Sequence, residues 1–362
     1  MKSHRISYGL WLLLLAAAFL LTGCGTSKPE QTVVSELELI KKLDEQTILS
    51  FVSYEDIMSS EAPSTDIGPE TTEAVQLFFQ NFDYRILSSR VSKNTAIVKV
   101  RLTNLDMQSL ARDMCLALTA RSADPRTAPE DLSMNDYFAL LGEVMKSHSY
   151  KILSTDARFE LTKLSDGSWS ILSGDDLEDQ LVGGFISYLN DPYLVTPEEI
   201  LALTFDYFLE FSPEDWIAYL NMDDIFATGS TLGEELDLEL ASQISRYFSY
   251  QIKDSTIDGD SASVTLTVTS LNLENVLNDC REKLLDYAAT TEAIRATDAE
   301  LADKTAKMLL TSLKANETTL SQDIDILFTN NGSSWEMQLG ENFSNALLGN
   351  AVSAISALTG ET

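Results

Sequence analysis

Histidine and cysteine, the residues that most often build metal sites and nucleophilic triads, are nearly absent from this chain. Its 362 residues include two histidines and three cysteines. A zinc site usually needs three or four such ligands, and a serine triad needs a histidine oriented by an acid. The sequence also has no His-Glu-x-x-His, Cys-x-x-Cys or Gly-x-Ser-x-Gly pattern. We therefore expect no metal, no cofactor and no catalytic residue of these classes.

Basic residues are scarce as well. The chain has 25 Lys and Arg against 56 Asp and Glu, a formal net charge of −31 at pH 7. Nucleic-acid binding needs a basic surface, so we expect no nucleic-acid partner. The same charge argues against lying flat on an anionic membrane, because acidic protein and acidic lipid repel. The hydrophobic content of 44% is nevertheless ample for folded cores.

The N-terminus carries a secretory signal that ends at a cysteine. Lys2 and Arg5 precede an apolar run, residues 8–21, which is shorter than the roughly 20 residues of a stable membrane anchor. The run ends in Leu21-Thr22-Gly23-Cys24, which resembles the lipobox of bacterial lipoproteins. In that family the signal is cut before the cysteine, which then carries a diacylglyceryl group.

This resemblance implies that residues 1–23 are a signal peptide, that Cys24 is lipidated and that residues 24–32 form a lipid-anchored tether. It implies a protein held at the extracytoplasmic face of the cell membrane, with plain secretion as the alternative. The other cysteines, Cys115 and Cys280, lie far apart in the sequence. We expect them to be buried free thiols, because a lone cysteine commonly behaves as a small hydrophobe.

The remainder of the sequence contains a tandem duplication. A shift of 166 residues aligns the sequence with itself at apolar, glycine and tryptophan positions from residue 82 to residue 183. We therefore expect two repeats, residues 33–190 and residues 191–362. The aligned pairs include Tyr84 with Tyr250, Asp113 with Asp279, Trp169 with Trp335, and Gly183 with Gly349.

Each repeat is predicted to run in one order: helices, a β-hairpin, a helical excursion, a second β-hairpin and a last short helix. Thr196-Pro197-Glu198-Glu199 is a capping box at the entry to the second repeat, and Ser35 and Ser53 suggest weaker helix starts in the first. Alternating apolar residues and turn residues predict the hairpins. The predicted hairpins cover 84–103, 157–171, 250–269 and 324–337; the excursion helices cover 107–122, 131–148, 272–290 and 297–315; the last helices cover 176–189 and 342–358.

This order resembles the nuclear-transport-factor-like (cystatin-like) fold, in which helices pack on one face of a curved antiparallel sheet. The hairpin motif Asp166-Gly167-Ser168-Trp169-Ser170-Ile171 is similar to one in many Gram-positive lipoproteins of unknown function. The resemblance implies an α+β class with two tandem copies of such a sheet, each with its helical excursion between the two hairpins. It also implies a concave sheet face that can hold a ligand. The additional helices depart from the compact form of that fold.

Tyr84, Tyr250, Trp169 and Trp335 are the candidate pocket residues, because these aromatic side chains recur at strand positions in both repeats. Their alternating apolar neighbours favour the other interpretation, that they belong to the core. Fold alone does not establish an enzyme, so we expect a lipid-anchored, non-enzymatic protein that binds an envelope ligand or an envelope protein. The alternatives are a pocket enzyme of the isomerase, dehydratase or hydrolase type, and a structural or regulatory subunit of an envelope complex.

Overall fold

The computed structural model describes residues 28–43, 68–123, 133–221, 232–351 and 353. The chain divides into two compact units, with the main division between Leu194 and Val195. Cys24 and the predicted signal peptide, residues 1–23, lie outside the described residues. Among the helices that are described, none has the length and apolar composition needed to cross a bilayer.

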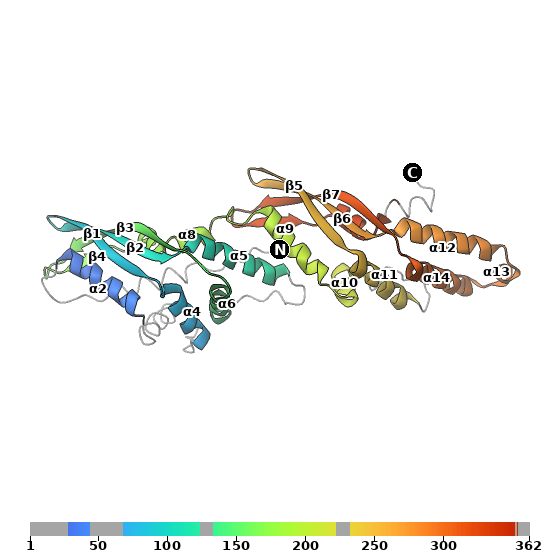
Figure 1. Cartoon of the computed structure of the whole chain (residues 1–362), viewed down its shortest axis with the longest axis horizontal. Coiled ribbons are helices and arrows are strands. Elements are labelled where there is room, and N and C mark those ends of the chain that lie inside the picture. Colours follow the sequence, from blue (N-terminus) through green and yellow to red (C-terminus); the bar gives the residue numbers. More distant parts are fainter. Residues whose placement is uncertain (1–27, 44–67, 124–132, 222–231, 352, 354–362) are drawn as a thin grey trace. The chain divides into compact units, whose positions relative to one another are not determined.

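The first unit is a four-stranded antiparallel sheet, in the order β1-β2-β3-β4, with helices on one of its faces (Figure 1). Helix α2 contacts β1, β2 and β4, and α7 contacts β3. The elements in chain order are α2 (Pro29–Lys42), α4 (Pro69–Phe79), β1 (Asp83–Ser92), β2 (Thr95–Leu105), α5 (Met107–Ala123), α6 (Met134–Ser147), β3 (Ile152–Lys163), β4 (Trp169–Ile171), α7 (Asp175–Leu181) and α8 (Phe185–Leu189).

The second unit repeats this plan with the sheet order β5-β6-β7-β8. Helices α9, α11 and α15 contact its strands, whereas α12 and α14 contact each other (Figure 1). The elements are α9 (Pro197–Leu209), α10 (Pro213–Leu220), α11 (Gly233–Tyr247), β5 (Ser249–Asp258), β6 (Ser261–Leu271), α12 (Leu273–Ala288), α13 (Thr291–Arg295), α14 (Asp298–Ala315), β7 (Thr319–Asn330), β8 (Trp335–Gln338) and α15 (Glu341–Leu347). Two tandem α+β units confirm the predicted fold class.

The two sheets agree in detail as well as in order. The bounds of β1 and β2, moved by 166 residues, are the bounds of β5 and β6. Each first strand has a β-bulge at the same place, between Ile86 and Ser88 in one unit and between Ile252 and Asp254 in the other. A bulge changes which residues of a strand point to a given face, so its repetition means that the faces of the two sheets can be compared residue by residue.

Several predicted helix boundaries need correction. Helix α2 begins at Pro29, so Ser35 is inside the helix and does not start it. Proline suits the first helical position, because the N–H of a residue there has no partner within the helix and proline has no N–H. The predicted helix over 176–189 is two helices, α7 and α8, separated by Gly183 and Gly184 with φ of 67° and 86°. Ser53 and most residues after 351 lie outside the described residues.

Alternate residues of the central strands form the core of each unit, as the period of a β-strand requires. Helices α2 and α9 place their apolar stripes over this face, with Val33, Leu37 and Ile40 buried in the first unit. In the second unit the rings of Phe205 and Phe343 lie 5.1 Å apart within an aromatic cluster. The buried strand residues are Ala96, Val98, Val100 and Leu102 on β2, and Ala262, Val264, Leu266 and Val268 on β6.

Candidate functional site

The two predicted tryptophans lie in the cores of their units. Trp169 opens β4 and is 9% exposed, and Trp335 opens β8 and is 5% exposed. The ammonium of Lys163 lies 5.8 Å from the centre of the Trp169 ring, and covers part of it. Both indoles therefore occupy packing positions, and neither presents an open aromatic surface to a ligand.

The two predicted tyrosines connect the first strand of each sheet to the first helix of its unit. Tyr84 Oη donates a hydrogen bond to Glu38 Oε1 at 2.7 Å, and Tyr250 Oη donates to Asp206 Oδ1 at 2.6 Å. Burial and then the bond to Glu38 raise the pKa of Tyr84 to about 12, and the corresponding causes raise the pKa of Tyr250. Both phenols are therefore protonated hydrogen-bond donors at neutral pH, a role that suits a structural link and not a general base.

A further pair of equivalent polar residues was not singled out from the sequence. Asn104 and Ser270 are buried at the ends of β2 and β6. Asn104 Nδ2 donates to the carbonyl of Leu181 at 3.3 Å, and Ser270 Oγ donates to the carbonyl of Leu347 at 2.6 Å. Both carbonyls belong to the last residue of the helix that follows the second hairpin, where helical partners are lacking. The alignment at 166 residues pairs these positions and could have identified them.

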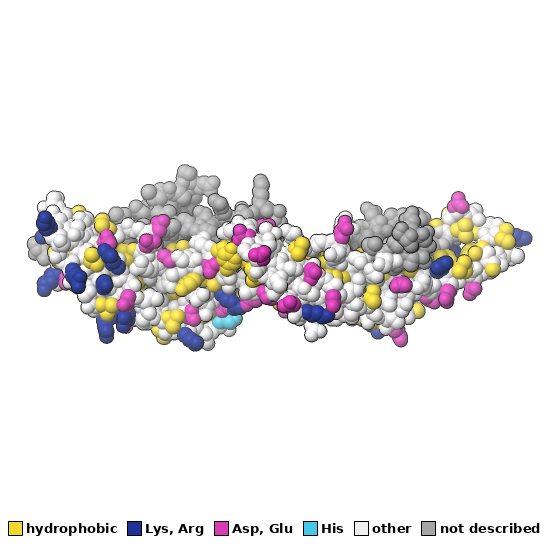
Figure 2. Space-filling model, turned by 90° about the horizontal axis from the view of Figure 1, so that it is seen from above, with side chains coloured by type: hydrophobic (Ala, Val, Ile, Leu, Met, Phe, Trp, Pro, Cys, Tyr) yellow, Lys and Arg dark blue, Asp and Glu magenta, His cyan; other side chains and the backbone are white. Residues whose placement is uncertain are grey.

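The exposed face of the first sheet is where the two units differ most. On the side of the sheet opposite the helices, alternate residues of β1, β2 and β3 point to solvent. We call this surface the basic face, and its basic members are Arg85, Arg90, Lys99, Arg101 and Arg158. In Figure 2 dark-blue side chains gather over the part of the first unit that carries the β1–β2 hairpin.

Like charges stand directly opposite each other on the basic face. Arg85 is paired in register with Arg101, and Lys99 is paired with Arg158. Directly opposed like charges destabilise an antiparallel sheet. Arg101 is partly compensated, because its Nε donates to Asp156 Oδ1 at 2.7 Å. Arg85, like Arg90, makes no ion pair with any residue that the structure describes.

The other acids of the basic face, Asp83 and Glu160, also have cationic partners. Asp83 accepts a hydrogen bond from Lys41 Nζ at 2.6 Å, and Glu160 Oε1 lies 2.8 Å from Arg158 Nη2. The bond to Lys41 holds the pKa of Asp83 below its usual value, and the bond to Arg101 does the same for Asp156. These carboxylates therefore stay charged at neutral pH, and they already have cationic partners.

On the equivalent face of the second sheet, two of the acids are bonded within the sheet, and the third, Asp254, lies opposite Thr265 and not opposite another charge. Thr265 Oγ1 donates to Asp325 Oδ1 at 2.6 Å, and Thr267 Oγ1 donates to Asp323 Oδ1 at 2.8 Å. Lys253 Nζ lies 2.7 Å from the same Asp323 oxygen. The position of Arg85 is taken here by Gln251, and that of Lys99 by Thr265. The opposed like charges are thus a property of the first unit and not of the shared fold.

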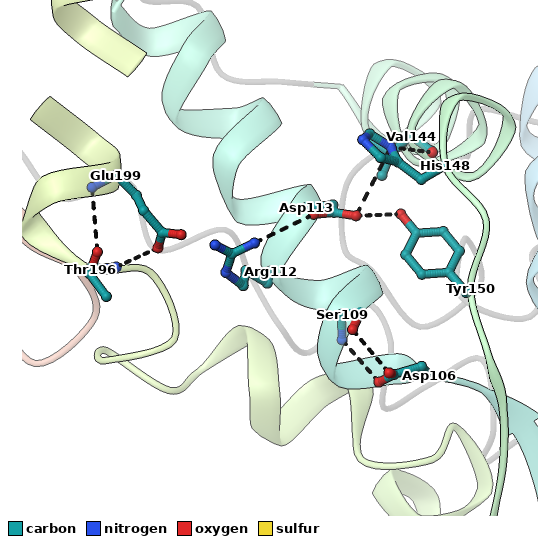
Figure 3. A network of polar contacts seen from close by, with 9 residues as sticks. All are labelled: Asp106, Ser109, Arg112, Asp113, Val144, His148, Tyr150, Thr196 and Glu199. Atoms are coloured by element: carbon teal, nitrogen blue, oxygen red, sulfur yellow. Dashed lines mark hydrogen bonds and ion pairs between the residues drawn. The ribbon is translucent and has the colours of Figure 1, made fainter. Parts of the chain in front are cut away.

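A polar network in the first unit joins α5 to the chain that enters β3 (Figure 3). Tyr150 Oη donates to Asp113 Oδ2 at 2.9 Å, and His148 Nδ1 lies 4.0 Å from that oxygen. His148 Nδ1 also lies 3.2 Å from the carbonyl of Val144. Burial and then the bond to Asp113 raise the pKa of Tyr150, so this phenol remains protonated. In the second unit, Asp279 aligns with Asp113 but accepts a hydrogen bond from Lys283 of its own helix, so the described residues of that unit do not repeat the network.

One carboxyl of the first unit is buried without a full set of partners. Glu36 on α2 is 6% exposed, and its Oε2 has no hydrogen-bond partner among the described residues. Desolvation raises the pKa of Glu36 to about 7, since burial disfavours the charged form. Matching Pro29 with Pro197 places Thr204 at this position in α9, where its hydroxyl donates to the carbonyl of Ile200. The second unit therefore has no carboxyl at this point.

In the described part of the chain, burial makes the two thiols less reactive, and the acids do not gather into a metal site. Cys280 is buried and Cys115 is half-buried, neither forms a disulfide with a described residue, and burial raises the pKa of Cys115 to about 11. A raised pKa reduces the thiolate that reacts. Over the same residues, no group of three or more His, Cys, Asp and Glu side chains is placed to hold a metal ion.

Comparison with known proteins leaves the function to be argued from these residues. No family model and no curated protein matches the chain. Among solved structures, the chain matches ycdA of Bacillus subtilis, described as a "putative lipoprotein", at 13% identity and a TM-score of 0.26. The match covers 74% of this chain and 94% of that one. A likeness at this level carries no argument about fold or function.

Proposed function

We propose that this chain is a lipid-anchored protein of the extracytoplasmic face of the cell membrane that acts by binding, without catalysis. The Leu21-Thr22-Gly23-Cys24 motif supports the anchor. We also propose that each unit has the nuclear-transport-factor-like (cystatin-like) fold, supported by helices that lie on one face of a four-stranded antiparallel sheet.

The observation that carries the binding role is the contrast between the two exposed sheet faces. Both units keep the same inner links, Tyr to carboxylate and β-strand to helix carbonyl. On the outside, the first sheet opposes Arg85 to Arg101 and Lys99 to Arg158, at a cost in stability, whereas the second sheet, as described, has no like charges directly opposed. Destabilising arrangements that persist in a fold are characteristic of functional surfaces. The basic face is therefore the binding surface, and its partner is anionic.

An enzyme is the second candidate, because Asp113, Tyr150 and His148 lie close together. The raised pKa of Tyr150 opposes it, since a phenol that stays protonated is a poor base. The candidates differ in which substitutions matter. In a strain that lacks the chain, Arg85→Gln with Lys99→Thr should fail to restore competitive growth, whereas Asp113→Asn with Tyr150→Phe should restore it. The reverse result would support the enzyme and overturn the binding role.

The anchor is tested separately in the same strain. Labelled fatty acid should enter the wild-type chain, and Cys24→Ala should abolish the label and release the protein from the membrane. Label that persists in Cys24→Ala would show that the anchor is elsewhere.

A further inference from the structure

The first unit is held close to the membrane at one particular end, if Cys24 carries the lipid as proposed above. Four residues separate Cys24 from Pro29, the buried first residue of α2. A fully extended chain covers at most about 3.5 Å per residue, so Pro29 lies within roughly 17 Å of the lipidated cysteine. Because this distance is an upper limit, the short tether lets this end come within one Debye length of the membrane, about 8 Å at physiological salt, where its charges interact with those of the lipid headgroups.

The contacts of α2 show which end this is. Near its C-terminal end, Lys41 bonds to Asp83, the first residue of β1. The helix also contacts β4, which pairs with the last residues of β3. Those residues pair with the beginning of β2, directly after the β1–β2 turn. Helix α2 therefore runs from the β1–β2 turn toward the start of β1, and the tether leaves the unit beside that turn.

This end of the unit is basic. Lys93 is the turn residue, with φ of 55°, and Arg90 precedes it on the basic face. The backbone N–H of Lys163 donates to the carbonyl of Asn94 at 2.8 Å, which brings Lys163 to the same turn. All three basic side chains are exposed. We call them the basic tip. Figure 2 shows dark-blue side chains gathered here.

Two acids lie at the same end of the unit as the basic tip, Glu30 in the first turn of α2 and Asp166. Asp166 lies in the β3–β4 turn, where its Oδ1 accepts hydrogen bonds from the backbone and side chain of Ser168, which lower its pKa. In the second unit the turn corresponding to Lys93 is Asp258-Gly259-Asp260. The first unit thus has a cationic hairpin turn, which adjoins the tether, and the second unit has an anionic turn at the equivalent place.

From this geometry we propose that the basic tip and the adjoining basic face of the first unit dock on the anionic lipid headgroups beneath them. The proposal names the partner of the surface assigned above, and rests on that assignment. It explains how a chain with a net charge of −31 can lie against an anionic surface: the cations are concentrated where the lipid holds the chain. Docking would fix the first unit against the membrane.

The test uses the mature chain, residues 24–362 with Cys24→Ser, so that binding cannot come from the lipid. Binding is measured by co-sedimentation with phosphatidylcholine vesicles that contain one-third phosphatidylglycerol, and with phosphatidylcholine alone. Each basic residue near an anionic surface contributes about five-fold in affinity. Arg90→Gln, Lys93→Gln and Lys163→Gln together should therefore weaken binding to the anionic vesicles by roughly 100-fold.

A matched control removes three charges from exposed sites of the second unit, by Arg281→Gln, Arg295→Gln and Lys307→Gln. The proposal predicts that this control keeps wild-type binding and that wild-type binding falls as salt is raised. Equal losses in the two triple variants, or no binding of the wild type to anionic vesicles at low salt, would overturn the proposal. If soluble polyphosphate binds through the basic tip while vesicles do not, the partner is a phosphate polymer; the binding function would stand and lipid docking would be wrong.

Discussion

Replacing Arg85 by Gln and Lys99 by Thr, the residues that the second unit has at these positions, should make the first unit more stable. The change removes one member of each opposed pair, Arg85 with Arg101 and Lys99 with Arg158. Two unit charges about 6 Å apart in water repel by about 0.7 kcal/mol, and opposed pairs in sheets contribute about 0.2–1 kcal/mol each. Loss of the attraction between Lys99 and Asp156 offsets part of the gain. The double variant should thus gain about 0.5–1 kcal/mol.

The gain is measured by urea unfolding, followed by circular dichroism, at low and at high salt. It should be largest at low salt and should vanish at high salt, because salt screens exposed charges. Lys28→Gln with Lys151→Gln, which removes two exposed charges of the same unit outside the basic face, is the control and should not increase stability. A destabilised double variant, or an equal gain in the control, would refute the claim that the basic face is strained for function.

Two further predictions test the packing of the repeats and the buried carboxyl. Gly349→Ala should cost more than about 3 kcal/mol, because a Cβ there would lie 2.1 Å from the carbonyl oxygen of Leu271 in addition to the positive φ. Gly259→Ala, with positive φ and open space around it, should cost only about 1–2 kcal/mol. Because the folded state prefers protonated Glu36, its contribution to stability is full below about pH 4.5 and is lost as pH rises through about 7. Between about pH 5 and pH 8, wild type should therefore lose about 2 kcal/mol more than Glu36→Gln.

Each of these two predictions can be contradicted by one result. Equal unfolding free energies for Gly349→Ala and Gly259→Ala would show that the backbone of Gly349 does not lie against the carbonyl oxygen of Leu271. For the carboxyl, Glu143→Gln is the matched exposed control on α6. If the pH dependence of Glu36→Gln matches that of wild type and of Glu143→Gln, Glu36 is not buried as the structure has it.

The repeats could be predicted because one constant offset aligns the sequence with itself, and the hairpins could be predicted because their signals are local. Alternation of apolar residues gives the strands, and Gly or Asn gives the turns between them. The split of the last helix was missed because Gly183 and Gly184 have apolar neighbours that continue a helical pattern. Glycine in the left-handed region ends a helix whatever the pattern around it, and the pair of glycines was the available signal.

The basic face could not be predicted, for two physical reasons. Arg85 and Arg90 lie an odd number of residues apart, so a regular strand would place them on opposite faces. The bulge between Ile86 and Ser88 brings them to the same face, and its position is not visible in the sequence. The net charge of −31 is also an average over the chain, and an average conceals a local cationic surface. The charge argument against membrane contact holds for the chain as a whole and does not extend to this face.

The central claim, that the basic face is the working surface, is tested most directly by photo-crosslinking in living cells. A benzophenone amino acid replaces Ser88, which is exposed on the basic face opposite Lys99, or Thr256, which is exposed on the second sheet. The account predicts crosslinks to envelope material from position 88, lost when Arg85→Gln and Lys99→Thr are added, and few or none from position 256. Equal crosslinking from the two positions, or none from position 88, would contradict it.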